Sequence, residues 1–94
     1  MAPPIDQLTK EGYDLQFGTN VIGPYVFTKR LLSLLTAGAK SSDDKRARVV
    51  NTSSIGQIFT DTIHFEALSD VPLRKEIGTN NMYLASKLVS CIRL

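Results

Sequence analysis

The feature that most constrains the fold is that the sequence contains one strand-like run, RVVNTSS, at residues 48–54. The run is β-branched and apolar at Val49 and Val50, and it turns polar from Asn51 onward. A single strand leaves its backbone donors and acceptors unpaired along both edges, and its apolar side chains need neighbouring strands and flanking helices. The sequence therefore predicts part of an α/β fold and not a complete domain.

A long helical pattern precedes this run. Apolar residues recur at three- and four-residue steps through GTNVIGPYVFTKRLL, which is typical of an amphipathic helix. Thr9 is the predicted N-cap, and the helix is predicted to run from about Lys10 to about Ala37. Because a proline inside a helix costs about 3 kcal/mol, Pro24 predicts a break or bend near residues 18–24.

Weaker patterns come after the strand-like run. IHFEALSD at residues 63–70 predicts a short helix, and IGTNN at residues 77–81 predicts a loop. YLASKLVSCIRL predicts a final helix from Tyr83, with Cys91 packed in the helix core. The apolar face of this final helix is predicted to carry Leu84, Leu88, Cys91 and Ile92. The expected architecture is a long helix, one strand, a short insert helix and a final helix.

Composition excludes several classes of protein. The net charge of +2 is too small to indicate a nucleic-acid or membrane partner. A single cysteine cannot form an internal disulfide, which argues against a disulfide-stapled secreted module. No targeting leader is recognisable, and no apolar run approaches the ~18 residues of a membrane-spanning helix. The default expectation is a cytoplasmic protein.

Three groups of polar residues lie where an active site could assemble. Ser53 and Ser54 end the strand-like run, and ligands of parallel α/β sheets bind outside the carboxyl ends of the strands. Tyr83 and Lys87 are four residues apart and so share one helical face. An ammonium beside a phenol favours the phenolate, which makes a tyrosine more useful as a proton donor and acceptor near neutral pH. Asn20 lies close to the proline that interrupts the first helix.

Each feature also has a simpler interpretation. A tyrosine four residues before a lysine is common by chance, and it then lies on the surface. Serines after a strand usually cap the next turn, and an asparagine within a helix is usually exposed or marks a local bend. His64 lies near Asp61 and Glu66, but no other histidine or cysteine is suitably spaced, so no metal site is predicted.

Taken together, these groups resemble the short-chain dehydrogenase/reductase family, NAD(P)-dependent oxidoreductases with a Rossmann fold. NVIGPYVFTKRLL resembles the family's N-x-x-G helix, RVVNTSS its N-x-S-S strand end, and YLASK its Y-x-x-S-K motif, in the family's order. GYDLQFGTN and the long interval between Ser54 and Tyr83 resemble the retinol-dehydrogenase-like and related fungal branches. The resemblance covers nearly the whole chain. It implies the central slice of a Rossmann-type doubly wound parallel sheet.

The resemblance also implies a role for each site residue. Tyr83 would be the general acid in carbonyl reduction and the general base in alcohol oxidation. Lys87 would support Tyr83 and hydrogen-bond the nicotinamide ribose, so that Tyr83 and Lys87 would also contact the cofactor. Ser54 would hold the substrate oxygen, and Asn20 would hold a water that links Lys87 to solvent. The implied cofactor is NAD or NADP, the implied substrate is a small alcohol or carbonyl compound, lipophilic by analogy, and the complete enzyme is expected to form a homo-oligomer.

The same resemblance suggests a reason for the proline. Because Pro24 has no N–H, the carbonyl of Asn20 lacks its usual helical partner and could bind the relay water. The alternative is a bend that serves packing only.

The sequence departs from the family at the cofactor. It contains no Gly-rich G-x-x-x-G-x-G turn, and MAPP resembles the segment that comes after the family's N-N-A-G strand. We therefore expect residues 1–94 to be a partial domain that lacks the N-terminal dinucleotide-binding half and the C-terminal substrate region, and that is inactive alone. A non-catalytic product that acts as an interaction module and a decayed remnant remain as alternatives.

Overall fold

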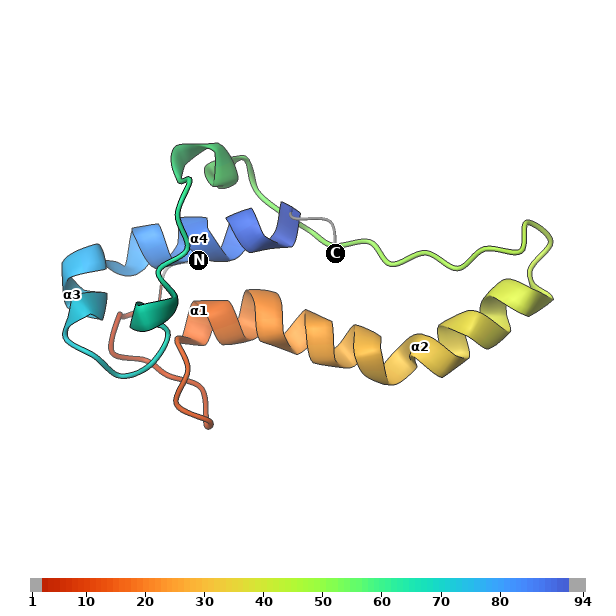
Figure 1. The fold of residues 1–94 in the computed structure, drawn as a ribbon, viewed down its shortest axis with the longest axis horizontal. Coiled ribbons are helices and arrows are strands. Elements are labelled where there is room, and N and C mark those ends of the chain that lie inside the picture. Colours follow the sequence, from red (N-terminus) through yellow and green to blue (C-terminus); the bar gives the residue numbers. More distant parts are fainter. Residues whose placement is uncertain (1–2, 92–94) are drawn as a thin grey trace.

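A computed structural model describes residues 3–91 of the chain, and these residues form a set of helices joined by extended segments (Figure 1). The first three elements adjoin one another without a gap and make one long helical rod. In chain order the elements are α1 (Leu15–Phe17), the π-helical turn η1 (Gly18–Ile22), α2 (Gly23–Ser41), the 3₁₀ turns η2 (Ile55–Phe59) and η3 (Phe65–Ala67), α3 (Leu73–Ile77) and α4 (Thr79–Cys91). The start of the rod and η2 both pack against α4.

The predicted strand at residues 48–54 is not formed as a strand. Residues 46–54 carry no assigned secondary structure, and no strand is present among residues 3–91. The segment is nevertheless extended, and it runs back from the far end of α2 toward α4 (Figure 1). A strand is defined by hydrogen bonds to a neighbouring strand, and the described part of the chain offers none. The predicted parallel sheet is therefore absent from these residues.

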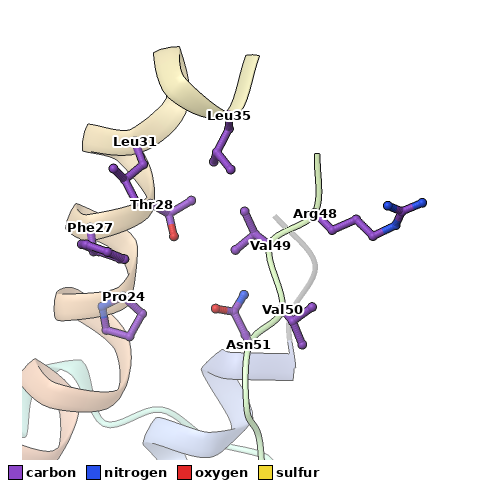
Figure 2. Close-up of a pocket in the computed structure, with 9 residues that line it drawn as sticks. All are labelled: Pro24, Phe27, Thr28, Leu31, Leu35, Arg48, Val49, Val50 and Asn51. Carbon is purple, nitrogen blue, oxygen red and sulfur yellow. The ribbon is translucent and has the colours of Figure 1, made fainter. Parts of the chain in front are cut away.

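Side chains of this segment nevertheless alternate as in a strand. Val49 and Asn51 point toward α2, whereas Arg48 and Val50 point away from it (Figure 2). Val50 is consequently 88% exposed. Alternation with a period of two residues is the geometry of a β-strand, so the backbone is already shaped to receive strand neighbours.

The prediction for the first helix is wrong at its start. Thr9 caps a tight turn instead, since its Oγ1 accepts the N–H of Tyr13 at 3.1 Å and its carbonyl accepts the N–H of Gly12 at 2.9 Å. Asp14 is the true N-cap, with its Oδ1 accepting the N–H of Phe17 at 2.8 Å. Thr9 and Asp14 both have side chains suited to capping, so this local pattern did not distinguish them.

The interruption predicted near residues 18–24 takes the form of a π-helical turn. The N–H of Gly23 donates to the carbonyl of Gly18, five residues back. Pro24 follows directly as the second residue of α2. Because it has no N–H, the carbonyl four residues back lacks the donor that it would have in an α-helix. The helix continues to Ser41, beyond the predicted end at Ala37.

The second half of the chain is more helical than predicted. The short insert helix is confirmed as η3, but IGTNN is not a loop, because α3 ends at Ile77 and α4 begins at Thr79. The buried face of α4 is formed by Met82, Ala85 and Ser86 rather than by the predicted leucine face. Cys91 is exposed and not in a core. Ile92, the last predicted member of the leucine face, lies outside the described residues.

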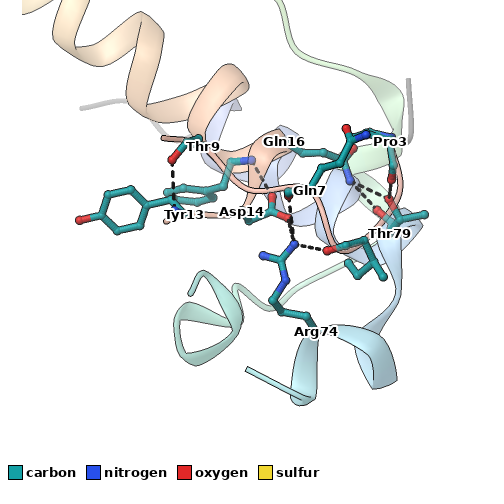
Figure 3. Close-up of polar contacts among 10 residues, drawn as sticks. Pro3, Gln7, Thr9, Tyr13, Asp14, Gln16, Arg74 and Thr79 are labelled. Atoms are coloured by element: carbon teal, nitrogen blue, oxygen red, sulfur yellow. Dashed lines mark hydrogen bonds and ion pairs between the residues drawn. The ribbon is translucent and has the colours of Figure 1, made fainter. Parts of the chain in front are cut away.

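A buried ion pair joins the N-terminal segment to α3 (Figure 3). Arg74 Nη2 lies 3.2 Å from Asp14 Oδ2, and both side chains are 3% exposed. The same Nη2 donates to the carbonyls of Ile5 and Gln7. The backbone N–H of Asp14 donates to the carbonyl of Leu68 at 2.7 Å. Asp14 therefore caps the helical rod and also links it to the residues that precede α3.

Apolar side chains are mostly left in contact with solvent. The buried hydrophobic residues of the described chain are Phe17, Ala67, Met82 and Ala85. In contrast, Phe27 and Leu34 on α2 and Phe59 on η2 are 67%, 66% and 71% exposed. Exposed apolar surface of this extent marks an interface. No helix within residues 3–91 combines the length and the apolar character needed to cross a bilayer.

The isolated polypeptide of residues 1–94 is expected to unfold without cooperativity. Its few buried apolar side chains cannot offset an ordering entropy of ~1 to 2 kcal/mol per residue. Differential scanning calorimetry should show a broad transition, and a dye specific for exposed apolar surface should bind at room temperature. A sharp, reversible transition of the isolated chain would contradict this expectation.

The buried ion pair is expected to matter far more than a surface pair. In the full-length protein, Arg74→Met leaves the Asp14 carboxylate buried without its partner, which should lower the free energy of unfolding by about 3–5 kcal/mol. The matched control is Arg48→Met, because Arg48 Nη2 lies 2.6 Å from Asp44 Oδ2 with the two side chains 64% and 48% exposed. Arg48 holds the pKa of Asp44 below its usual range, but solvent screens the pair. Urea titration of both variants measures the difference, and equal midpoints would refute the expectation.

Candidate active site

Tyr83 and Lys87 lie one turn apart on α4, as their spacing predicts. Lys87 Nζ is 5.8 Å from the centroid of the Tyr83 ring. The same Nζ donates to the carbonyl of Thr52 at 3.4 Å. The lysine ammonium therefore lies between the tyrosine and the extended segment that ends in the two serines.

A second tyrosine–lysine pair shows that this spacing alone does not define a site. Tyr25 and Lys29 lie one turn apart on α2, with Nζ 5.9 Å from the ring centroid. Tyr25 is 53% exposed, and it corresponds to the simpler interpretation of such a pair. What distinguishes Tyr83 and Lys87 must therefore be their surroundings.

Ser54 caps η2, the turn that packs against α4. Its Oγ accepts the N–H of Gly56 at 3.2 Å, so the capping role that serines commonly have after a strand is present. Gly56 is buried, and a Cβ atom at this position would lie 3.4 Å from Ser54 Oγ, 3.8 Å from Tyr83 Cε1 and 2.8 Å from Leu84 Cδ2. A larger residue at this position would require the end of the Leu84 side chain to move. Since capping uses a lone pair of the hydroxyl oxygen, the hydroxyl proton of Ser54 is still available to a ligand.

Ser53 attaches the extended segment to α4. Its Oγ donates to the carbonyl of Lys87 at 2.9 Å, and Cys91 Sγ lies 3.0 Å from the same oxygen. Ser53 and Ser54 thus have different partners. The role of Ser54 as the residue that holds the substrate oxygen stays a prediction.

Asn20 reaches α4 through Ser86, a residue for which the sequence predicted no role. Asn20 Nδ2 donates to Ser86 Oγ at 3.0 Å, and Ser86 Oγ donates to the carbonyl of Tyr83 at 2.7 Å. Ser86 is 0% exposed. The predicted connection of Asn20 was to Lys87 through water, whereas its contact in the structure is with Ser86. The available signal was the serine three residues after Tyr83, since such a serine can bond back to the preceding turn.

Two cavities lie beside the rod. One of about 270 Å³ lies between α2 and the extended segment, and its lining includes Pro24, Leu35 and Val49 (Figure 2). A larger one of about 860 Å³ is lined by residues of η1, α2, the extended segment and α4, and these include Asn20 and Cys91. Ser54, Tyr83 and Lys87 line neither cavity.

The sequence predicts no metal site at His64, although Asp61 and Glu66 lie near it as possible ligands. In the structure, His64 Nδ1 lies 3.5 Å from Glu66 Oε1. Across residues 3–91, no three side chains of histidine, cysteine, aspartate or glutamate come together as a metal site would require.

Comparison with known proteins identifies the family. Two short-chain dehydrogenase/reductases from Armillaria gallica are each 45% identical to the chain over 87 residues. A short-chain dehydrogenase/reductase from Emericella nidulans is 48% identical over 54 residues, which are 57% of this chain and 17% of that protein. No family model and no solved structure matches the chain.

The chain belongs to the short-chain dehydrogenase/reductase family over the residues it shares with these proteins. The match to the Armillaria proteins covers 93% of this chain but 27% of theirs. The resemblance stated from the three motifs is thus confirmed. The named relatives are fungal, while the likeness to retinol dehydrogenases stays a prediction.

The π-helical turn generates a prediction about Pro24. Pro24→Ala restores an N–H that can donate to the carbonyl of Asn20, four residues back, as in an α-helix. If that carbonyl holds a relay water, the variant of the full-length protein should show a shifted pH profile of turnover. Pro72→Ala, an exposed proline at the N-cap of α3, is the control. A crystal structure and pH profile both unchanged by Pro24→Ala would leave packing as the sole reason for the bend.

Proposed function

We propose that these residues form the proton-transfer centre of an oxidoreductase that uses NAD or NADP to interconvert an alcohol and a carbonyl compound. The chain spans 27% of the length of its Armillaria relatives, so the proposal concerns the full-length protein. Residues 1–94 are proposed to be a partial domain and to be inactive alone. A cytoplasmic location and a homo-oligomeric enzyme remain predictions.

The observation that carries the proposal is the convergence of three distant segments on α4. Asn20 contacts Ser86, the turn that Ser54 caps packs against α4, and Lys87 bonds the segment before the serines. The comparison pair on α2 has the same tyrosine–lysine geometry without these neighbours. A hydroxyl, a phenol and an ammonium close together support acid/base chemistry on an oxygen atom.

In the proposed reaction, the phenol of Tyr83 gives its proton to the carbonyl oxygen of the substrate during reduction. It takes that proton back during alcohol oxidation. The nearby charge of Lys87 would stabilise the phenolate left after transfer. Ser54 would donate its hydroxyl proton to the same substrate oxygen and so fix its position. Asn20, whose Nδ2 is used by Ser86, would hold a water through its backbone carbonyl oxygen.

The residues present fit one end of a nicotinamide cofactor. An ammonium has three donors, and Lys87 uses one of them on Thr52 at a long 3.4 Å, which leaves donors for ribose hydroxyls. When bound, the cofactor supplies or accepts the hydride. The sequence contains no Gly-rich turn for a pyrophosphate, so the proposal assigns cofactor contacts only to Tyr83 and Lys87.

The two tyrosine–lysine pairs provide a matched test in the full-length protein. Tyr83→Phe removes the proton donor, so turnover of NADPH or NADH with decanal should fall at least about 10²-fold, the lower range for general acid catalysis. Cofactor binding, measured by nicotinamide fluorescence, should persist. Tyr25→Phe, made on the exposed pair, should leave turnover within about two-fold.

Two outcomes would overturn the proposal. Equal turnover in Tyr83→Phe and the wild-type protein would exclude Tyr83 as the proton donor. Equal losses in Tyr83→Phe and Tyr25→Phe would indicate a general effect on folding.

Lys87→Met and Ser54→Ala should each lower turnover. Ser54→Ala also removes the cap on the N–H of Gly56 and should lower the melting temperature, so its turnover is measured at a temperature where the variant is folded.

A further inference from the structure

Gln16 is a buried polar residue that joins the helical rod to the first residue of α4. Its side chain is 5% exposed. Its Nε2 donates to the carbonyl of Thr79 at 2.8 Å and to Thr79 Oγ1 at 3.1 Å (Figure 3). Thr79 Oγ1 in turn donates to the carbonyl of Pro3 at 2.6 Å. One glutamine amide therefore ties together the rod, the N-terminal segment and the start of α4.

A second contact lies further along both elements. Asn20 comes four residues after Gln16 and donates to Ser86, which comes seven residues after Thr79. The two contacts run in the same direction along the rod and along α4, so they attach the two elements at two separate points. Two attachment points restrain rotation of α4 about its own axis as well as sliding along it.

Tyr83 lies between these attachment points on α4, and Lys87 is the residue directly after the second. A displacement by one residue along an α-helix corresponds to a 1.5 Å translation and a rotation of about 100°. Such a displacement would turn Tyr83 away from Ser54. Both contacts are directional hydrogen bonds, and each has one buried partner, Gln16 in the first and Ser86 in the second. They therefore select a single register where apolar packing alone would permit several.

We propose that Gln16 is a positioning residue that fixes the register of α4 and thereby places Tyr83 and Lys87 against Ser54. For its catalytic consequence the proposal rests on the proposed oxidoreductase function. Its structural content does not depend on that function, because the register of α4 can be measured without turnover.

The test compares Gln16→Met with Gln7→Met in the full-length protein. Methionine has nearly the length of glutamine but donates no hydrogen bond. Gln7 is the matched control, since it is exposed and its contacts with Leu15 and Arg74 use its backbone carbonyl. We expect Gln16→Met to lower kcat for decanal reduction by about ten- to a hundred-fold, with KM within about two-fold. Amide hydrogen exchange at residues 79–83 should become faster. Gln7→Met should change neither quantity.

The outcomes separate this proposal from the proposed function. An unchanged kcat in Gln16→Met overturns the proposal, as does a change confined to KM. Absence of turnover in the wild-type protein would contradict the proposed function alone. In that case unchanged exchange at residues 79–83 overturns the role of Gln16, and faster exchange there upholds it. If Gln16→Met does not fold, Thr79→Val removes only the hydroxyl partner and should lower kcat about five-fold, whereas an unaltered kcat would overturn the proposal.

Discussion

Hydrogen bonds from the side chains of Gln16 and Asn20 attach the helical rod to α4 at two points. The described chain buries few apolar side chains, and it buries Asp14, Gln16, Arg74 and Ser86 as completely. A buried polar group that loses its partner costs about 1–3 kcal/mol, so each of these contacts penalises an alternative packing. The proposed consequence for function is geometric, since the register of α4 that these bonds define would determine how Tyr83 and Lys87 face Ser54.

A second constraint is the extended segment that ends at the two serines. It is attached to α4 through Ser53, and it is spaced from α2 by a cavity of about 270 Å³. Its alternating side chains, and a backbone without strand neighbours in the described residues, suit a strand within a sheet. The exposed apolar residues of α2 and η2 suit burial by further elements of an α/β domain. The chain covers 27% of the length of its Armillaria relatives, which agrees with this interpretation. The parallel sheet itself stays a prediction.

The local sequence pattern predicted that Tyr83 and Lys87 share a helical face. It did not predict the long-range contacts through which other segments reach α4. Spacing placed Tyr83 and Lys87 on one helical face, and the strand-like run placed the serines at its polar end. The contacts that complete the site join residues far apart in the chain, such as Asn20 and Ser86, which are 66 positions apart. A single sequence carries no local signal for such partners. Arg74 was missed for the same reason, since its partner Gln7 precedes it by 67 positions.

Errors at the helix boundaries have a related cause. Thr9 and Asp14 are both good N-caps, and only the contact of Asp14 with Arg74 and Leu68 decides between them. Pro24 signalled an interruption, but the sequence did not show that the interruption would be a π-helical turn closed by the bond from Gly23 to Gly18.

A crystal structure of the full-length protein with a nicotinamide cofactor would test the proposed site most directly. We expect residues 48–52 to be hydrogen-bonded to strands on both edges, with Tyr83 and Ser54 facing the nicotinamide. A cofactor bound away from Tyr83, or residues 48–52 left unpaired, would contradict the proposed arrangement.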